Sequence, residues 1–546
     1  MRYRHIQRLA AAGLHGTRDL GFALPLFLLT LAVAQPAAAR PCGQVVPCTP
    51  ITLEGPIPNP LPGDPAAIAH NPLAGNRQVE TFPGYVQEEF FFAGDVDVFD
   101  YDQQPGERGA FPGERLVAVQ SDVPYKTRMV VLRPKQAKKF NGTVVVEFMN
   151  STGGRDNAVM WTVSADYFTR EGIVFIGVTT SGNQSMAALL RGCGPAPSFP
   201  SCGTRYSSNG LVISNNGQEY EIMSQLVTAL KSRIANQIPL PSNFPRVKRV
   251  FVTAESQQAG SVITQATQFH FPGVDGYLPL SNTGVRALRS GLPTCGTAGA
   301  PAYPGCVAVP TNRLIRTDLP VPVYQVLTET DVQVAARQDD TNISRFASYR
   351  LIEIAGGVHN TDHTQPVPGT NFQLGDFCVN PSNTLASGPI FGSHVVTAYF
   401  QNMLLQKDFG IRPPTVERIA KDAAGVTLRD ALGNPLGGAR LPEMDVPINE
   451  YFSPFNQGKP VCATGQDPGS PPVCIPQPFA LIGFACNLSG SYRPLTPEVI
   501  DGLYPTHRVY VRKIAEKAFE QFLRRNLLWE EAVEHIRDAA ESDVGN

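Results

Sequence analysis

The chain has 546 residues, enough for one large α/β domain with insertions or for two domains. Its apolar content of 42% is that of a globular protein with a buried core, and its formal net charge of −2 argues against a polyanionic partner such as nucleic acid. The 49 prolines and 49 glycines predict long, irregular loops around that core.

Residues 1–39 have the pattern of a secretory signal peptide. Arginines supply positive charge near the N-terminus, residues 20–34 are apolar, and alanines 37–39 offer a cleavage site. An uncleaved N-terminal anchor is the alternative. Because no later stretch reaches about 18 consecutive apolar residues, we expect no membrane span in the mature chain and a periplasmic or extracellular location.

All 10 cysteines follow this segment, and an even number in an exported chain indicates disulfides. No C-x-x-C motif and no Cys/His cluster with zinc spacing occurs, so we expect no bound metal. The spacings suggest four local pairs and one long-range pair, although spacing alone leaves the connectivity open: Cys42–Cys48, Cys193–Cys202, Cys295–Cys306, Cys462–Cys474 and Cys378–Cys486.

Residues 40–83 are rich in proline and are expected to wrap over the surface of the protein. From residue 84 to residue 364, apolar runs alternate with helical patterns. Several of the runs are unbroken and β-branched, as in strands that are buried on both faces. The predicted strands are Thr127–Leu132, Thr143–Met149, Ile173–Val178, Val247–Thr253, Val321–Leu327 and Tyr349–Ile354.

Two segments between these strands, Ala158–Glu171 and Gln218–Ala235, have helical patterns. The alternation predicts an α/β fold with a doubly wound, mostly parallel sheet, to which cysteine-stapled loops are added. We expect residues 365–494 to be a loop-rich insertion that caps or flanks this core. Residues 495–546 are expected to form C-terminal helices that pack on the core through Phe519, Phe522, Leu523, Leu527 and Trp529.

The most informative segment is VFVTAESQQAGSVITQATQFH, residues 250–270. It predicts a strand, a sharp turn that carries Ser256, and a helix. This is the geometry that a nucleophilic serine needs, because the turn lifts Oγ out of the sheet and the helix N-terminus favours developing negative charge. The alternative is a serine that caps an ordinary helix of an α/β protein.

A serine nucleophile also needs a base and an orienting carboxylate, which follow it in the order acid, then histidine, in doubly wound hydrolases. Glu329 and Asp331 come directly after one predicted strand, and His359 follows two glycines after the next. These groups stand at the carboxyl ends of strands, where ligands bind in open α/β sheets. A surface acidic turn and a surface histidine are the alternatives.

An oxyanion hole would require two backbone N–H groups. One is expected from Gln257, the residue after the serine, and the other from the loop that follows an early strand. The alternative for that loop is an ordinary glycine-rich turn between a strand and a helix. A phosphate-binding role is not expected, because the loop carries no phosphate-binding motif. The candidate residues of the loop are Ser151, Thr152, Gly153 and Gly154.

At these positions the chain resembles the α/β-hydrolase superfamily, and more closely the bacterial "α/β hydrolase domain-containing" family of esterases. The resemblance runs from about residue 84 to the C-terminus. It implies an α/β-hydrolase fold with Ser256 as nucleophile, His359 as base and Asp331 or Glu329 as acid, of which we prefer Asp331. The segments that carry it are NSTGGRDNAVMW (150–161), Ser256-Gln257, TETDV (328–332), RQDD (337–340), EIAGGVHNTDH (353–363), RLPEMDVPINEY (440–451) and LYPTHRVYVRKI (503–514).

One departure concerns the G-x-S-x-G pattern, which here reads Ala254-Glu255-Ser256-Gln257-Gln258. Small residues normally flank the serine because the strand and the helix approach closely there. The long side chain of Gln258 is therefore expected to loosen the turn.

The sequence thus predicts an exported serine hydrolase of carboxylic esters that needs no cofactor and takes a small-molecule or polymeric ester. The alternatives are an extracellular esterase directed at polymers, of polyester or feruloyl type, and a catalytically dead binding protein that keeps the fold. The oligomeric state stays open.

Overall fold

A computed structural model describes most of the chain after the N-terminal segment. The described residues are 41–44, 46–60, 73, 79–101, 116–152, 156–191, 205–232, 237–282, 284, 288, 315–334, 337–338, 340, 347–359, 392–452, 486, 488 and 490–546. They belong to one compact unit, Ala39–Asn546. The segment expected to be a signal peptide lies outside the described residues.

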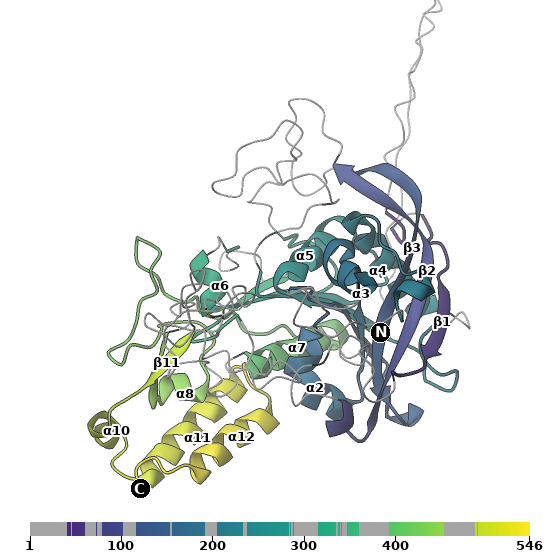
Figure 1. Ribbon diagram of the computed structural model, residues 1–546. Helices are drawn as coiled ribbons and strands as arrows, with labels where there is room; N and C mark the ends of the chain where they lie inside the picture. Colours follow the sequence, from purple (N-terminus) through teal and green to yellow (C-terminus); the bar gives the residue numbers. More distant parts are fainter. Residues whose placement is uncertain are drawn as a thin grey trace, which may run out of the picture. The chain divides into compact units, whose positions relative to one another are not determined.

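A mixed sheet of nine strands forms the centre of the described structure, in the order β1-β2-β3-β5-β4-β6-β7-β8-β9 (Figure 1). The strands from β5 to β9 run parallel, whereas β1, β2 and β3 pair antiparallel and attach to β5. The bounds are β1 Thr52–Ile57, β2 Tyr85–Tyr101, β3 Leu116–Pro134, β4 Thr143–Phe148, β5 Val174–Val178, β6 Arg249–Glu255, β7 Gly276–Leu280, β8 Val323–Thr328 and β9 Tyr349–Ile354.

All six predicted strands are present, the first as the last part of the longer β3. The β-branched runs are buried as expected, since every residue of β4, β5, β8 and β9 is buried. The three other strands of this sheet were not predicted. β1 lies within the proline-rich segment, β2 is a long antiparallel strand, and β7 contains a proline that obscures its pattern.

Helices cover both faces of the sheet (Figure 1). Alternate residues of β4 enter two separate hydrophobic clusters, Val144 and Val146 with α4 and α5, and Val145 with α2 and α7. The sheet is therefore doubly wound, as predicted. The helices described are α2 Val159–Glu171, α3 Ala187–Arg191, α4 Glu219–Ser232, α5 Ala259–Gln268, α6 Glu329–Val334, α7 Ser393–Phe409, α8 Pro442–Asp445, α10 Pro497–Leu503, α11 His507–Leu523 and α12 Trp529–Glu541.

The helix α7 was not predicted, and it lies within residues 365–494, the segment expected to be a loop-rich insertion. Its Phe400 packs against Phe168 of α2 and Phe251 of β6, with ring centroids 5.5 Å and 5.3 Å apart. α7 is thus part of the core layer beneath the sheet. Its apolar side chains are not confined to one stripe, so the helical period is weak in this segment. The same region also contributes β10 (Asn449–Phe452) and β11 (Ser491–Pro494), which pair with each other.

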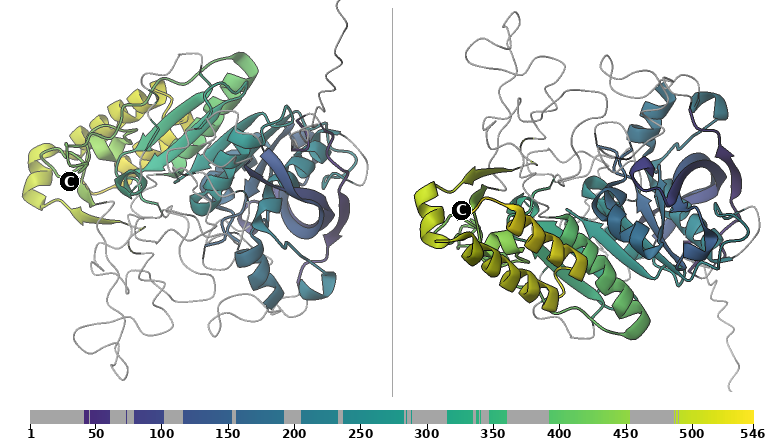
Figure 2. Two further views of the ribbon diagram at one scale, coloured as in Figure 1. Left: turned by 90° about the horizontal axis from the view of Figure 1, so that it is seen from above. Right: turned by 90° about the horizontal axis from the view of Figure 1, so that it is seen from below.

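The C-terminal segment is helical as predicted, and the helices α11 and α12 lie beside α7 (Figure 2). The predicted buried face is wrong in part. Leu527 is buried and Phe522 half-buried, but Phe519, Leu523 and Trp529 are 51%, 62% and 52% exposed. α11 instead buries residues spaced four and three apart, which share one face of the helix: Ile514, Ala518 and Gln521.

The predicted disulfide Cys42–Cys48 is present. Cys486 is also disulfide-bonded, but its expected partner Cys378 and the other predicted pairs lie outside the described residues. None of the helices in the described part of the chain combines the length and the apolar character that a membrane crossing needs.

Removal of the Phe400 ring should lower the free energy of unfolding by about 3–5 kcal/mol, because it leaves a cavity between α7, α2 and the sheet. The matched control is Phe409→Ala in the same helix, where the ring is 71% exposed and the change should be small. Urea denaturation of F400A and F409A measures both values. Equal losses would show that α7 does not belong to the core.

Candidate active site

Ser256 stands at the junction of β6 and a 3₁₀ turn, Ser256–Gln258, that runs directly into α5. Its φ of +55° is unusual for a residue with a side chain and reverses the chain within one residue. The side-chain amide of Asn282 donates a hydrogen bond of 2.7 Å to the Ser256 carbonyl oxygen, which holds the turn from the end of β7. The predicted strand, turn and helix are therefore formed.

Gln258 stands two residues after the serine, at a position where the G-x-S-x-G pattern has a small residue. Its side chain is fully buried, and its amide donates to Thr180 Oγ1 at 2.9 Å and to Glu219 Oε2 at 3.4 Å. The long side chain thus enters a polar space between β5 and α4 instead of separating the strand from the helix. The tight turn is compatible with glutamine at this position.

His359 follows β9 and the two glycines of the predicted loop. Gly356 has a φ of +70°, and a Cβ there would lie 2.7 Å from the sulfur of Met444, so any larger residue at this position would be strained. His359 Nε2 lies 2.9 Å from Ser256 Oγ, and its Nδ1 lies 2.6 Å from Asp331 Oδ1. The structure thus brings together three side chains that are separated by up to 103 residues in the sequence.

The two candidate carboxylates differ clearly in what they contact. Asp331, in the first turn of α6, reaches His359 with one oxygen and accepts bonds from the Thr328 N–H (2.8 Å) and hydroxyl (2.7 Å) with the other. Glu329 instead accepts from the Gly356 N–H at 3.2 Å and forms an ion pair with Arg429. Glu329 therefore fixes the loop that carries the histidine, whereas Asp331 contacts the histidine itself.

A further carboxylate, which was not among the site residues predicted from the sequence, also faces the histidine. Glu255 Oε1 lies 3.2 Å from His359 Nε2, on the side where Ser256 stands. The sequence feature that could have identified Glu255 is its position directly before the serine, at the end of β6.

No cluster of three or more metal-ligating side chains occurs among the described residues.

The charges of these groups are strongly coupled. Burial lowers the pKa of His359, but the negative charges of Asp331 and Glu255 outweigh it and raise this pKa to about 9. Burial raises the pKa of Glu255 to about 7, against the opposing effect of His359. Burial also acts to raise the pKa of Asp331, but its bonds to His359 and Thr328 leave this pKa below its ordinary value. The histidine is therefore held in an environment that favours its charged form.

The loop after β4, which carries the predicted oxyanion-hole residues, lies beside the serine turn. The side-chain amide of Gln257 donates to Ser151 Oγ at 2.9 Å and to Thr152 Oγ1 at 3.2 Å. The Thr152 N–H itself donates to Asn150 Oδ1 at 2.7 Å, so this candidate donor is engaged within the loop. Gly153 and Gly154 lie outside the described residues.

Buried charges anchor this loop and the helix that follows it. Arg128 of β3, fully buried, forms an ion pair of 2.7 Å with Asp156, next to the loop. Glu147 of β4 accepts the Met160 N–H at 3.1 Å with each of its oxygens and so caps α2, which has no capping side chain of its own. The loop is thereby tied to the sheet on both sides.

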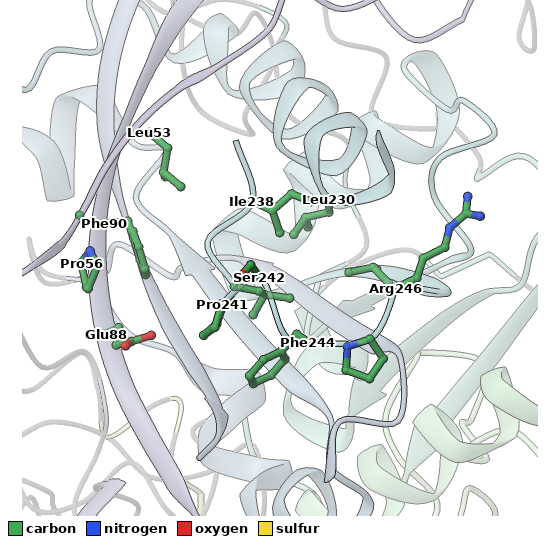
Figure 3. Close-up of a pocket in the computed structure, with 14 residues that line it drawn as sticks. Leu53, Pro56, Glu88, Phe90, Leu230, Ile238, Pro241, Ser242, Phe244 and Arg246 are labelled. Carbon is green, nitrogen blue, oxygen red and sulfur yellow. The ribbon is translucent and has the colours of Figure 1, made fainter. Parts of the chain in front are cut away.

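A large pocket of about 960 Å³ lies elsewhere in the molecule, between the β1–β2 pair and the segment that precedes β6 (Figure 3). Its lining includes Leu53, Phe90, Ile238 and Phe244 and none of the residues around Ser256.

A family model described as "Alpha/beta hydrolase domain" matches residues 54–537. The chain belongs to the alpha/beta hydrolase family. The match covers every element of the site, from the loop after β4 to the histidine after β9. The comparison with curated proteins gives no match.

The solved structures to which the chain is similar are distant in sequence. A putative dienelactone hydrolase from Klebsiella pneumoniae subsp. pneumoniae MGH 78578 is 12% identical, over 48% of this chain and 85% of that chain, with a TM-score of 0.24. The methylesterase BT1017 is 15% identical, over 45% and 43%, with a TM-score of 0.23. The serine hydrolase XC6422 from Xanthomonas campestris is 10% identical, over 42% and 78%, with a TM-score of 0.22. The family assignment rests on the family model.

The positive φ of Ser256 should be measurable as backbone strain. Ser256→Gly and Ser256→Ala both remove the hydroxyl, but only glycine adopts this conformation without a steric cost. The glycine variant should therefore be more stable than the alanine variant by about 0.5–1 kcal/mol, even though glycine gains more entropy on unfolding. Thermal unfolding of both variants measures the difference. An alanine variant of equal or greater stability would contradict a strained turn.

Proposed function

We propose that this protein is a serine hydrolase of carboxylic esters in which Ser256 is the nucleophile, His359 the base and Asp331 the acid. The observation that carries the proposal is the continuous chain of hydrogen bonds from Asp331 through His359 to Ser256 Oγ, 2.6 Å and 2.9 Å long. The left-handed turn at Ser256 supports it, because such a turn exposes a nucleophilic hydroxyl at the end of a strand.

In the first half of the reaction, His359 Nε2 takes the proton of Ser256 Oγ as the oxygen attacks the ester carbonyl carbon. The tetrahedral intermediate collapses with cleavage of the bond to the alcohol oxygen, and His359 returns the proton to the departing alcohol. In the second half, His359 deprotonates a water molecule that attacks the acyl-serine, and the carboxylic acid leaves as Ser256 regains its proton. Asp331 accepts the Nδ1–H throughout and stabilises the charged imidazole.

The oxyanion of each intermediate would be stabilised by the Gln257 N–H and by an N–H of the loop after β4, for which Ser151 is the described candidate. Gln257 stands in the first turn of its helix, where N–H groups have no acceptor within the helix. The contacts between the Gln257 side chain and Ser151 support this pairing, since they bring the two backbone segments together.

We also infer that the protein is exported. The inference is supported by the basic, apolar and small-residue pattern of residues 1–39 and by the disulfide Cys42–Cys48 just after it. An esterase outside the cytoplasm could act on small esters or on polymers, and a comparison of turnover on soluble and polymeric esters separates these substrates.

Ser256→Ala should reduce kcat on short p-nitrophenyl esters by about four to six orders of magnitude, because it removes the attacking atom. The variant should keep the wild-type fold, which circular dichroism checks. A fluorophosphonate probe should label the wild-type protein and not S256A. Undiminished turnover by S256A would reject the assignment, and a wild-type protein that is neither labelled nor active would indicate a dead hydrolase fold.

The choice of acid is tested by a matched pair of substitutions. Asp331→Asn should lower kcat by about four orders of magnitude, because it reverses the hydrogen bond that fixes the histidine tautomer. Glu329→Gln should keep most of its kcat but lose about 1–3 kcal/mol of unfolding free energy, since Arg429 then faces a neutral amide instead of a carboxylate. The opposite result, with activity lost in E329Q and kept in D331N, would make Glu329 the acid.

A further inference from the structure

Among the described residues, two carboxylates face the His359 imidazole, one at each ring nitrogen. Asp331 contacts Nδ1 at 2.6 Å, and Glu255 lies 3.2 Å from Nε2, the nitrogen that also faces Ser256 Oγ. The proposed reaction needs one of these carboxylates. The other has no role in the proton transfers described above.

Glu255 is held rigidly in this position. Its side chain is only 8% exposed. Its Oε2 accepts a bond of 2.6 Å from the side-chain amide of Asn150, and the same amide lies 3.3 Å from the Glu255 carbonyl oxygen. Asn150 stands at the end of β4, the strand next to β6, so the carboxylate is oriented by the neighbouring strand and its other oxygen, Oε1, is left facing His359.

The ionisable groups that face Glu255 come from three neighbouring elements. They are His359 after β9, Asp331 of α6 and Glu147 of β4. Glu147 is occupied by the first N–H groups of α2, and burial raises its pKa well above the ordinary value. Among these groups, His359 alone can carry a positive charge, so the charge of Glu255 acts mainly on the imidazole.

We propose that Glu255 is a positioning residue that binds the Nε2–H of the His359 imidazolium and thereby sets the lower pH limit of the reaction. The inference rests on the proposed function of Ser256 and His359. The reaction begins from the neutral imidazole, whose Nε2 must accept the serine proton. Because a second carboxylate stabilises the protonated ring, neutral imidazole becomes the main form only at higher pH. Turnover is therefore lost as the pH falls through the raised pKa of His359, and loss of the Glu255 charge moves this limit to lower pH.

The test is the pH dependence of the rate at which a fluorophosphonate probe labels Ser256, which needs no knowledge of the natural ester. In the wild-type protein the rate should fall with decreasing pH around a midpoint above 6.5, the ordinary imidazole pKa. Glu255→Gln should move the midpoint down by about one to three pH units, the effect of one adjacent opposite charge. Glu255→Asp, which keeps the charge, should leave the midpoint close to that of the wild type.

The matched control is Glu54→Gln, the same chemical change at a carboxylate of β1 that is 48% exposed and pairs with Lys126. Its midpoint should equal the wild-type value. An unchanged midpoint in E255Q would overturn the proposal, as would a wild-type midpoint at or below 6.5, a result that does not depend on any variant folding. Absence of labelling in the wild type at every pH would instead reject the proposed function, so the two failures can be told apart.

Discussion

The structure of the site depends on the hydrogen bond between Asp331 and His359, because it decides which imidazole nitrogen faces the serine. With Nδ1–H donated to the carboxylate over 2.6 Å, Nε2 is the nitrogen that points at Ser256 Oγ. The bond is partly buried, and its carboxylate is fixed in turn by the Thr328 N–H and hydroxyl. An imidazole that is held in this way can exchange a proton with the serine without reorienting between steps.

The sheet supplies the geometry that makes this bond possible. β4, β6, β8 and β9 run parallel, so the residues that follow them meet at one edge although they are far apart in the sequence. Local backbone features complete the convergence. The left-handed conformation of Ser256 lifts its hydroxyl, and Gly356 lets the histidine loop pass close to Met444. The ion pair of Glu329 with Arg429 holds the base of that loop.

Much of this could be predicted from the sequence, because strands buried on both faces and a serine between strand and helix leave strong local patterns. The six predicted strands and the order serine, acid, histidine depend only on such patterns. α7 could not be predicted, since its apolar residues are not confined to one face of the helix. The buried face of α11 was also misjudged, because Phe519 and Leu523 are large and apolar but point away from the face that packs. Glu255 was not predicted because it stands at the unspecified position before the serine in the G-x-S-x-G pattern. The sequence does not show which groups its side chain contacts.

The most direct measurement is a crystal structure of the protein after reaction with a fluorophosphonate. Our account predicts a covalent bond from Ser256 Oγ to phosphorus, with the phosphoryl oxygen within hydrogen-bond distance of the Gln257 N–H and His359 still bound to Asp331 through Nδ1. Phosphorus attached to a different residue, or an imidazole turned away from the phosphonylated serine, would contradict it.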